Sequence, residues 1–255
     1  MHNRLKEKLQ NREKAIGTFF ESGSTITAEC LALGGLDYII IDTEHGPFET
    51  ESAMEFICAC QRRKMTPLVR VKDKYRSSIL KMLDVGAMGI VIPGIESVAE
   101  VNDIVRYGKY YPVGERGVAY ARGCGYGFAD SLSITDYFAE ANRETLLLPQ
   151  CETAGCLDRI EEIAAIEGID GIFIGPYDLS TALGKPGQFT APEVISAIDR
   201  ILKACQQAGK FSMIYADDTA AAKRRFQQGF DSVAVNMDTI LFIRMIQNLV
   251  RDLRH

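Results

Sequence analysis

Histidine is scarce in this chain. Of its three histidines, His2 and His255 lie at the two ends, and only His45 lies in the interior. Any imidazole chemistry must therefore use His45, and a zinc site built on several histidines is excluded. The seven cysteines are an odd number and none belongs to a C-x-x-C pair, so we interpret them as reduced thiols. Cys60 falls on the apolar stripe of a helix expected over residues 49–64, which predicts a small buried side chain.

Long hydrophobic runs and clustered basic residues are also missing. No apolar segment reaches the length that a membrane-spanning helix requires. The first residues are basic but lack the apolar core and the small-residue cleavage site of a secretory signal, so we expect a cytoplasmic protein. The net charge is −5 and the basic residues are dispersed, which argues against a nucleic-acid-binding surface.

Short apolar segments with β-sheet character alternate with helical periodicity along the whole chain. Strands that are apolar on both faces and are joined by helices are typical of a parallel sheet covered on both sides. Eight such units in 255 residues favour one domain, a (β/α)8 barrel over residues 1–255. The expected strands are residues 16–20, 38–42, 67–71, 89–93, 146–152, 171–175, 211–216 and 232–237.

A nucleotide-binding open sheet fits the sequence less well. The first strand is followed by residues 21–24, which lack the G-x-G-x-x-G pattern of a dinucleotide site. One connection also departs from the regular alternation, because residues 107–146 are too many for an ordinary turn and are rich in glycine, tyrosine and arginine. They include Arg116 and Arg122. Long ordered connections of this kind are typical of functional loops or interfaces.

Charged and polar residues collect where the expected strands end, which is where barrels carry their chemistry. Two of them, Glu152 and Asp178, could hold one divalent cation through oxygen ligands, which favours Mg²⁺ or Mn²⁺ over zinc. The same two carboxylates could instead cap helices or pair with arginines. The polar residues at strand ends are Asp42, Glu44, His45, Arg70, Gln150, Glu152 and Asp178.

Six motifs occur in a fixed order along nearly the whole chain. They are D-x-E-H-G with His45, V-R-V with Arg70, L-D-V-G-A with Asp84, Y-P-x-G-x-R-G-V with Arg116, Q-x-E-T with Gln150 and Glu152, and G-I-D-G-I-F-I-G-P-x-D-L-S with Asp178. Together they resemble the HpcH/HpaI family of class II pyruvate aldolases. The resemblance implies an enzyme, a carbon–carbon lyase with a pyruvate-type (β/α)8 barrel. Such an enzyme reversibly cleaves a 4-hydroxy-2-oxo acid to pyruvate and an aldehyde through a metal-stabilised pyruvate enolate.

The resemblance also implies roles for individual residues. Glu152 and Asp178 would hold a divalent cation, Mg²⁺ or Mn²⁺ with Co²⁺ as a further possibility, and Gln150 would support its water shell. Arg70 would stabilise the enolate that develops at the keto oxygen. His45, oriented by Asp84, would relay the proton of the 4-hydroxyl group. Further substrate contacts are expected from Gly175, Pro176 and Tyr177, at the start of a helix, and from Arg122 and Tyr215.

The sequence departs from the family pattern near the expected substrate. Tyr177 stands where some members carry a small residue, and Tyr215 adds a second phenol at the end of the seventh expected strand. These phenols suggest an acceptor aldehyde that is smaller or more polar than the semialdehyde used by the aromatic-degradation enzymes. Both tyrosines fit equally well as packing groups. Family barrels also exchange their last helix and assemble as hexamers built from dimers, and residues 239–253 read as an amphipathic helix suited to that exchange.

Three other readings remain open at this stage. Lys72 stands near a strand end and could act as a Schiff-base nucleophile, although flanking charges favour an exposed side chain. The same metal site could serve citrate-synthase-like or citrate- or acyl-CoA-lyase-like chemistry on oxaloacetate. The barrel could also bind a 2-oxo acid without catalysis. A phosphosugar substrate fits poorly, because the loops at residues 217–219 and 236–238 are acidic and lack phosphate-binding glycines.

Overall fold

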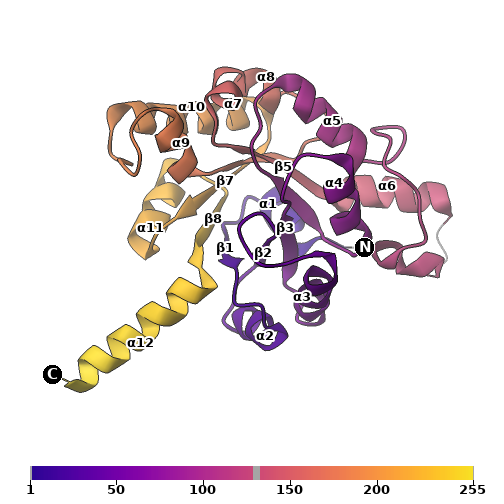
Figure 1. Ribbon diagram of the computed structural model, residues 1–255. Coiled ribbons are helices and arrows are strands. Elements are labelled where there is room, and N and C mark those ends of the chain that lie inside the picture. Colours follow the sequence, from indigo (N-terminus) through magenta and orange to yellow (C-terminus); the bar gives the residue numbers. More distant parts are fainter. Residues whose placement is uncertain (1, 129–132, 255) are drawn as a thin grey trace.

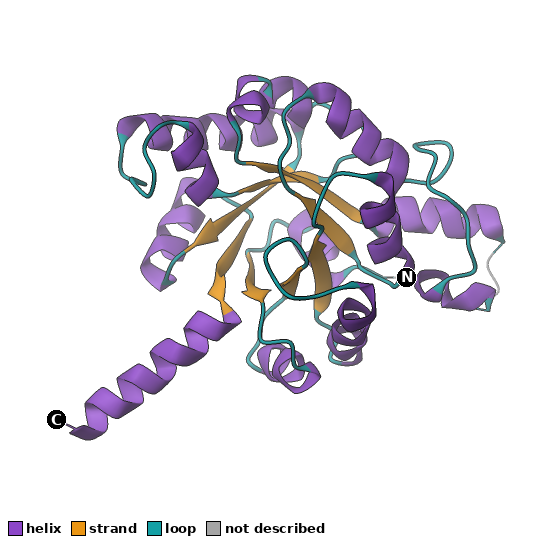
Figure 2. Cartoon of the chain, viewed as in Figure 1, coloured by secondary structure: helices purple, strands orange, loops and turns teal. Residues whose placement is uncertain are grey.

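Eight parallel strands close into a barrel in the computed structural model, which describes residues 2–128 and 133–254 (Figures 1 and 2). Each strand pairs with the next one along the chain, and β8 pairs with β1 to complete the ring. This confirms the (β/α)8 barrel predicted from the alternation of strands and helices. The strands are β1 (Ala15–Phe20), β2 (Tyr38–Asp42), β3 (Thr66–Arg70), β4 (Gly89–Ile92), β5 (Leu146–Cys151), β6 (Gly171–Ile174), β7 (Phe211–Ala216) and β8 (Ser232–Met237).

The strands are apolar on both faces because the barrel buries both of them. On β2, the side chains of Tyr38 and Ile40 belong to the cluster that fills the barrel, whereas Ile39 and Ile41 pack outward against the helices. Successive side chains of a strand point to opposite faces, so this alternation fixes which residues enter the barrel. The same alternation decides which polar side chains reach its interior at the strand ends.

Helices cover the outer surface of the barrel between successive strands (Figure 2). The expected helix at 49–64 is α3, and its Ala53, Phe56, Ile57 and Cys60 are buried as predicted. The long connection between β4 and β5 holds α5, a short 3-10 helix (η1) and α6. The helices outside the barrel are α2 (Thr25–Leu33), α3 (Thr50–Arg62), α4 (Arg76–Asp84), α5 (Val98–Gly108), η1 (Arg122–Gly127), α6 (Ile134–Glu144), α7 (Ala154–Asp158), α8 (Ile160–Ala164), α9 (Pro176–Ala182), α10 (Pro192–Ala208) and α11 (Thr219–Gln228).

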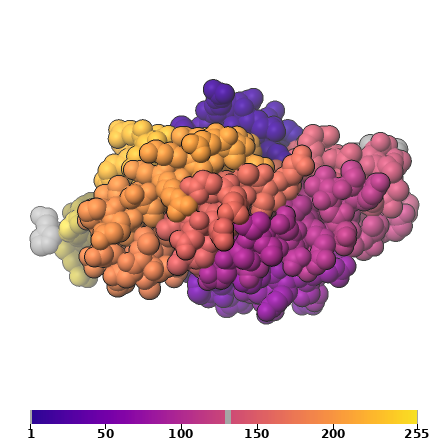
Figure 3. Space-filling view, turned by 90° about the horizontal axis from the view of Figure 1, so that it is seen from above, coloured from indigo at the N-terminus to yellow at the C-terminus, as the bar shows by residue number. Residues whose placement is uncertain are grey.

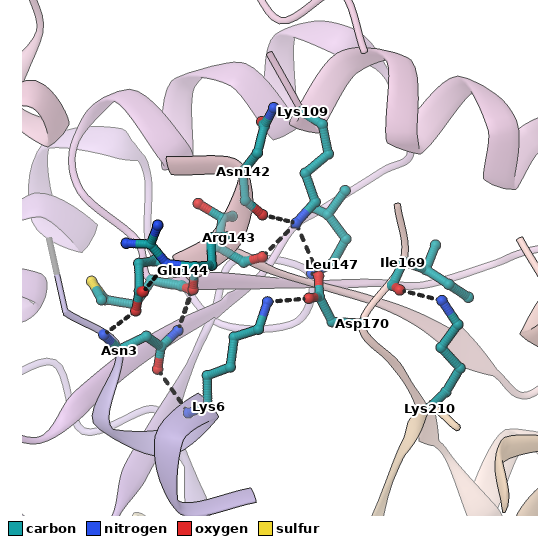
Figure 4. A network of polar contacts seen from close by, with 12 residues as sticks. Asn3, Lys6, Lys109, Asn142, Arg143, Glu144, Leu147, Ile169, Asp170 and Lys210 are labelled. Atoms are coloured by element: carbon teal, nitrogen blue, oxygen red, sulfur yellow. Dashed lines mark hydrogen bonds and ion pairs between the residues drawn. The ribbon is translucent and has the colours of Figure 1, made fainter. Parts of the chain in front are cut away.

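The amino-terminal end of the barrel is closed by α1 (Arg4–Gln10), whose Leu5 and Leu9 join the cluster inside the barrel. A polar network seals the same end (Figure 4). Asp170 accepts hydrogen bonds from the amino groups of Lys6 at 2.5 Å and Lys109 at 3.0 Å. Burial lowers the pKa of Lys109, and the charge of Asp170 opposes that change. The opposite end, where the carboxyl ends of the strands meet, is the one at which barrels carry their chemistry.

The last helix, α12 (Asp238–Arg254), leaves the barrel instead of packing on it (Figure 1). In the space-filling view it lies at one end of the molecule in yellow, while the pink segment around α6 lies at the other end (Figure 3). Its apolar side chains are exposed, and on the barrel the outer side chain of Ile16 on β1 is 42% exposed. The exposed apolar residues of α12 are Leu241, Phe242, Ile243, Met245, Ile246, Leu249, Val250 and Leu253.

Within residues 2–128 and 133–254, no helix combines the length and the apolar character that a bilayer crossing needs.

Candidate active site

Polar side chains enter the carboxyl end of the barrel because they continue the inward-facing alternation of the strands. Ile40, Leu68, Leu148 and Met213 face the interior in the middle of their strands. Residues two positions further along each strand share that orientation. The residues placed inside the carboxyl end in this way are Asp42 on β2, Arg70 on β3, Gln150 on β5 and Tyr215 on β7.

Arg70 is the central cation of this end of the barrel. It is 7% exposed, and its Nε and Nη2 atoms donate to the two carboxylate oxygens of Asp42 at 3.0 and 2.5 Å. Its Nη1 lies 3.1 Å from an oxygen of Glu44, and its guanidinium carbon lies 4.8 Å from the centre of the Phe19 ring. Burial alone would lower the pKa of Arg70, but the hydrogen bonds and charge of Asp42 outweigh it and the pKa rises. The site therefore contains a permanently charged and immobile cation.

His45 lies in a tight turn held by Asp42. Oδ1 of Asp42 accepts hydrogen bonds from the backbone N–H groups of Glu44 at 3.0 Å and His45 at 3.3 Å. Gly46 completes the turn, where an added Cβ would lie 2.2 Å from the Asp42 carbonyl oxygen, so no other residue fits without backbone movement. The His45 side chain is 67% exposed, and its Nε2 lies 3.8 Å from Glu44. The imidazole is thus free to meet a substrate that enters from solvent.

Glu152 and Asp178 supply two carboxylates on neighbouring elements. Glu152 directly follows β5 and is buried, and its Oε1 accepts a hydrogen bond of 2.8 Å from the backbone N–H of Gly94. Its Oε2 accepts from the amide of Gln150. Burial raises the pKa of Glu152, and the charge of Asp178, in the first turn of α9, adds to the rise. The charges of Glu152 and Asp178 therefore repel each other across this end of the barrel.

The residues around Glu152 fit a hard divalent cation. Oε1 of Gln150 is buried and has no hydrogen-bond partner among the described residues, so an oxygen that could bind a metal or a water molecule lies unused beside the carboxylate. Gly175 leaves room there, because an added Cβ would lie 2.8 Å from Oε2 of Glu152 and 3.0 Å from Nε2 of Gln150. In the part of the chain that the structure describes, no three His, Cys, Asp or Glu side chains gather at one point. The chain thus offers two carboxylates and leaves other positions to water or substrate oxygens.

The expected substrate tyrosines form an aromatic wall at the same end. The Tyr177 hydroxyl donates to Oδ1 of Asp217 at 2.7 Å, and its ring packs edge-on against Tyr215 and Phe189, with centroids 5.8 and 4.8 Å apart. Tyr215 in turn lies 6.1 Å from Phe19, the ring beneath Arg70. The hydrogen bond to Asp217, followed by burial, raises the pKa of Tyr177 to about 12. The pKa of Tyr215 is raised as well, first by burial and then by the charge of Asp217, so both phenols stay protonated near neutral pH.

Asp84 lies at the other end of the barrel. It is the last residue of α4, which runs back from the end of β3 to the start of β4. There its carboxylate accepts a hydrogen bond of 2.9 Å from Arg116, whose guanidinium lies 4.6 Å from the centre of the Tyr110 ring. Within one chain, Asp84 does not lie where it could orient His45.

Arg122 shares that remote position. It donates to the backbone carbonyl of Val85 at 2.8 Å and to the side chain of Gln61 at 2.7 Å. The cavity of about 710 Å³ beside it is lined by residues at the starts of β3, β4 and β5, such as Thr66 and Met88. Arg122 therefore does not line the carboxyl end of its own barrel, because the long connection after β4 folds back along the amino-terminal edge.

Sequence reasoning missed two acids of the site. Glu21 follows β1 by one residue, and its pKa is raised by burial and by the charge of Asp42. Its position two residues beyond the inward-facing Phe19 is the signal that would have found it. Asp217 sits in a loop, where the alternation of the strand no longer applies. Asp42 and Glu44 were recognised as polar residues at a strand end, but their ion pairs with Arg70 were not predicted.

The comparisons with known proteins agree with this geometry. A profile of the HpcH/HpaI aldolase/citrate lyase family matches residues 15–245. The hydroxypyruvate/pyruvate aldolase of Pseudomonas aeruginosa is 34% identical over 249 residues, which cover 97% of this chain and 91% of that protein. The crystal structure of an HpcH/HpaI aldolase/citrate lyase family protein from Burkholderia cenocepacia is 32% identical with a TM-score of 0.92, covering 99% of this chain and 100% of that one. The structure of citrate synthase SbnG is 27% identical with a TM-score of 0.88, covering 98% and 97%. The chain belongs to the HpcH/HpaI aldolase/citrate lyase family.

Proposed function

We propose that this protein is a class II pyruvate aldolase that reversibly cleaves a 4-hydroxy-2-oxo acid to pyruvate and an aldehyde. One observation carries the proposal: the buried Arg70 occupies the same end of the barrel as the Glu152 and Asp178 carboxylates. A cation site and a fixed guanidinium at one place can both stabilise negative charge on a carbonyl oxygen. The family and its 34% identical aldolase relative support the same reaction.

Glu152 and Asp178 would hold the divalent cation, with the unused oxygen of Gln150 supporting its water shell. Oxygen donors alone favour Mg²⁺ or Mn²⁺, and Co²⁺ would fit the same ligands. When bound, the cation supplies electrophilic stabilisation of charge at the carbonyl oxygen of a 2-oxo acid. Pro176 has no backbone N–H group, and the N–H of Gly175 already donates to the carbonyl oxygen of Cys151 at 3.4 Å. The N–H of Tyr177 would therefore meet the substrate carboxylate at the start of α9.

Cleavage breaks the bond between C3 and C4 of the substrate. The 4-hydroxyl group loses its proton and becomes the aldehyde carbonyl, while the electron pair of the broken bond moves toward the oxygen on C2. Arg70 would donate hydrogen bonds to that oxygen as its negative charge develops. Asp42 and Glu44 hold the guanidinium in place beforehand, so it does not have to reorganise during the reaction.

His45 would accept the proton of the 4-hydroxyl group, because it is the one interior histidine and its side chain is open to solvent. Asp84 can orient that imidazole only if a second copy of the chain brings its own amino-terminal edge to this site. We extend the same proposal to Arg122, which shares that edge with Asp84. The site would then be completed across an interface between copies.

The exposed α12 supports an assembly of this kind. A helix with eight exposed apolar side chains from Leu241 to Leu253 is costly in water, and the outer face of β1 at Ile16 is left partly open. A second copy could cover both by exchanging α12. We therefore propose a homo-oligomer with exchanged last helices, organised as a hexamer of three dimers.

The competing mechanisms are less well supported. Lys72 is exposed to solvent, whereas a Schiff-base lysine needs burial or a neighbouring cation to become nucleophilic. Chemistry on oxaloacetate would use the same residues, but the relative named citrate synthase shares 27% identity, against 34% for the aldolase. A binding protein without activity does not explain why Arg70, Glu152 and Asp178 lie at the same end of the barrel as the exposed His45.

A coupled assay of pyruvate release tests the proposal. The enzyme is supplied with a panel of 4-hydroxy-2-oxo acids in the presence of Mg²⁺, Mn²⁺ or Co²⁺, and again with a chelator. We expect release that depends on the metal, is abolished in Glu152→Gln and is kept in Lys72→Ala. The opposite pattern in the two variants, or release unaffected by the chelator, would overturn the assignment. Condensation of oxaloacetate with a second 2-oxo acid, without pyruvate release, would favour the citrate-synthase-like reaction.

A further inference from the structure

The carboxyl end of the barrel is rich in acids, and its buried cation is already paired. Arg70 is bound on both sides by Asp42 and Glu44. The other described arginine near the aromatic wall is Arg244 of α12, which donates to the backbone carbonyl of Asp217 at 2.8 Å. Acidic side chains stand around them in excess. Those not bound to Arg70 include Glu21, Glu152, Asp178, Asp217 and Asp238.

Asp217 is the acid that faces the aromatic wall. Its carboxylate accepts the hydrogen bond of Tyr177 at 2.7 Å, and its backbone carbonyl accepts from Arg244 and from the side-chain amide of Asn236, the latter at 2.7 Å. The charge of Asp217 also acts on Tyr215, because the pKa of that phenol is raised first by burial and then by this charge. Three hydrogen bonds, from α9, β8 and α12, thus hold Asp217 and the Tyr177 phenol at the rim.

Tyr177 connects this rim to the expected metal ligands. It directly precedes Asp178 on α9, and it is 49% exposed while its ring is held against Phe189 and Tyr215. A substrate bound at Asp178 and Arg70 would extend its leaving aldehyde toward this polar rim, because the barrel interior below is filled by apolar side chains. The acceptor aldehyde would therefore meet the Tyr177 hydroxyl and the Asp217 carboxylate.

We propose that Tyr177 and Asp217 form the subsite for the acceptor aldehyde and select uncharged, hydroxyl-bearing aldehydes over aldehydes that carry a carboxylate. The inference rests on the proposed aldolase function. A hydroxyl group on the aldehyde can donate to the Asp217 carboxylate, which the hydrogen bond from Tyr177 holds in place. A carboxylate on the aldehyde would be repelled by the negative charge of Asp217.

Two measurements on the full-length enzyme with Mn²⁺ separate this inference from the aldolase function. The first is exchange of the methyl protons of pyruvate with deuterium in heavy water without aldehyde, which reports enolisation alone. The second is kcat/KM in the condensation direction with pyruvate and three aldehydes: glycolaldehyde, propionaldehyde and 4-oxobutanoate. We expect glycolaldehyde to exceed both others by about tenfold, the usual value of one matched hydrogen bond.

Two variants test the named residues, and Tyr111→Phe, an exposed tyrosine after α5, serves as the control. Tyr177→Phe keeps the ring contacts, and it should lower kcat/KM for glycolaldehyde about fivefold while leaving propionaldehyde unchanged. Asp217→Asn removes the charge, and it should raise kcat/KM for 4-oxobutanoate about tenfold while lowering that for glycolaldehyde. Pyruvate exchange should persist in both variants. Loss of exchange in the wild type would reject the aldolase function itself.

The inference is overturned in either of two ways, provided that pyruvate exchange is normal. The wild type could prefer 4-oxobutanoate to glycolaldehyde, which would show that a cation receives the aldehyde. Alternatively, both variants could change all three aldehydes by the same factor, which would show that Tyr177 and Asp217 only support the fold.

Discussion

The guanidinium of Arg70 and the carboxylate of Asp42 form a two-point ion pair, with nitrogen–oxygen distances of 3.0 and 2.5 Å and both side chains buried. The same Asp42 oxygen also accepts two backbone hydrogen bonds from the turn that carries His45. One carboxylate therefore positions both the cation and the proton acceptor of the proposed reaction. Removal of the Asp42 charge should therefore disturb the positions of both Arg70 and His45.

Arg70→Lys tests the value of this two-point contact. Lysine keeps the positive charge but lacks the planar fork, so we expect kcat/KM to fall by about 10²- to 10³-fold, as when a preorganised donor is lost. Arg70→Ala should also lower the free energy of unfolding by about 3–5 kcal/mol, because it leaves the buried Asp42 charge unpaired. Kinetics and urea denaturation measure the two effects, with Arg159→Lys on the surface as the control. An active Arg70→Lys enzyme would show that charge alone is sufficient.

Glu152→Gln should stabilise the metal-free protein while it abolishes the response to metal. The pKa of Glu152 is raised in the folded state, so the folded protein holds the proton more tightly than the unfolded chain does. Stability contributed by that proton is lost as pH rises from the ordinary glutamate range through the raised pKa. At neutral pH the amide variant should therefore unfold at a higher urea concentration.

Mn²⁺ should reverse the order of stability of the wild type and Glu152→Gln. At a metal concentration of about one hundred times its Kd, the wild type should gain about 2.7 kcal/mol in unfolding free energy, whereas Glu152→Gln should gain little. Glu162→Gln, a surface change, should respond as the wild type does. Equal stabilisation of all three proteins by Mn²⁺ would place the metal elsewhere.

The raised pKa of Glu152 also predicts how metal affinity depends on pH. Below that pKa the carboxyl group keeps a proton that the metal must displace, so affinity should fall as pH decreases, approaching tenfold per pH unit. Calorimetric titration with Mn²⁺ from about pH 8 down to about pH 5 measures this, and proton release should rise over the same range. An affinity that stays constant through the range would remove Glu152 from the ligand set.

The strands and their order were predictable because they depend on local pattern. Most strands are short segments buried on both faces, and the alternation then fixes Asp42, Arg70 and Gln150 inside the carboxyl end of the barrel. The positions of Glu152 and Asp178 follow from the same rule, since both stand at or just after the carboxyl end of a strand. These features need no knowledge of distant contacts.

The remaining features depend on contacts that sequence pattern does not encode. Asp84 ends a helix, and the end of the barrel that it reaches depends on the direction in which that helix packs. Arg122 sits in a long connection whose path is set by tertiary contacts with Gln61 and Val85. The amphipathic pattern of α12 predicts a helix but does not show whether it covers its own barrel or another copy.

The exposed face of α12 predicts an oligomer that charged substitutions disrupt. Phe242 and Leu249 are 62% and 54% exposed, and burial of such side chains in an interface contributes about 1.5–3 kcal/mol each. The double variant Phe242→Asp with Leu249→Asp should shift the molar mass measured by light scattering toward the single chain. Gln247→Glu, on the same helix, should leave the mass unchanged. A wild type that is monomeric at all concentrations would reject the exchange of α12.

Complementation between inactive variants tests whether Asp84 acts across an interface. In the proposed assembly each site uses its own His45 and the Asp84 of a neighbouring copy. His45→Ala and Asp84→Ala should both be inactive alone, but co-expression in equal amounts would leave about a quarter of sites with both native residues. Co-expression of His45→Ala with Arg70→Ala is the matched control. His45 and Arg70 of each site come from the same chain, and every chain in this mixture lacks one of them. No site in the control therefore contains both native residues. Activity measured per oligomer, with the mass confirmed by light scattering, should therefore recover in the first mixture and not in the second. If neither mixture recovers while the oligomer is intact, Asp84 has no part in the site and its contact with Arg116 is structural.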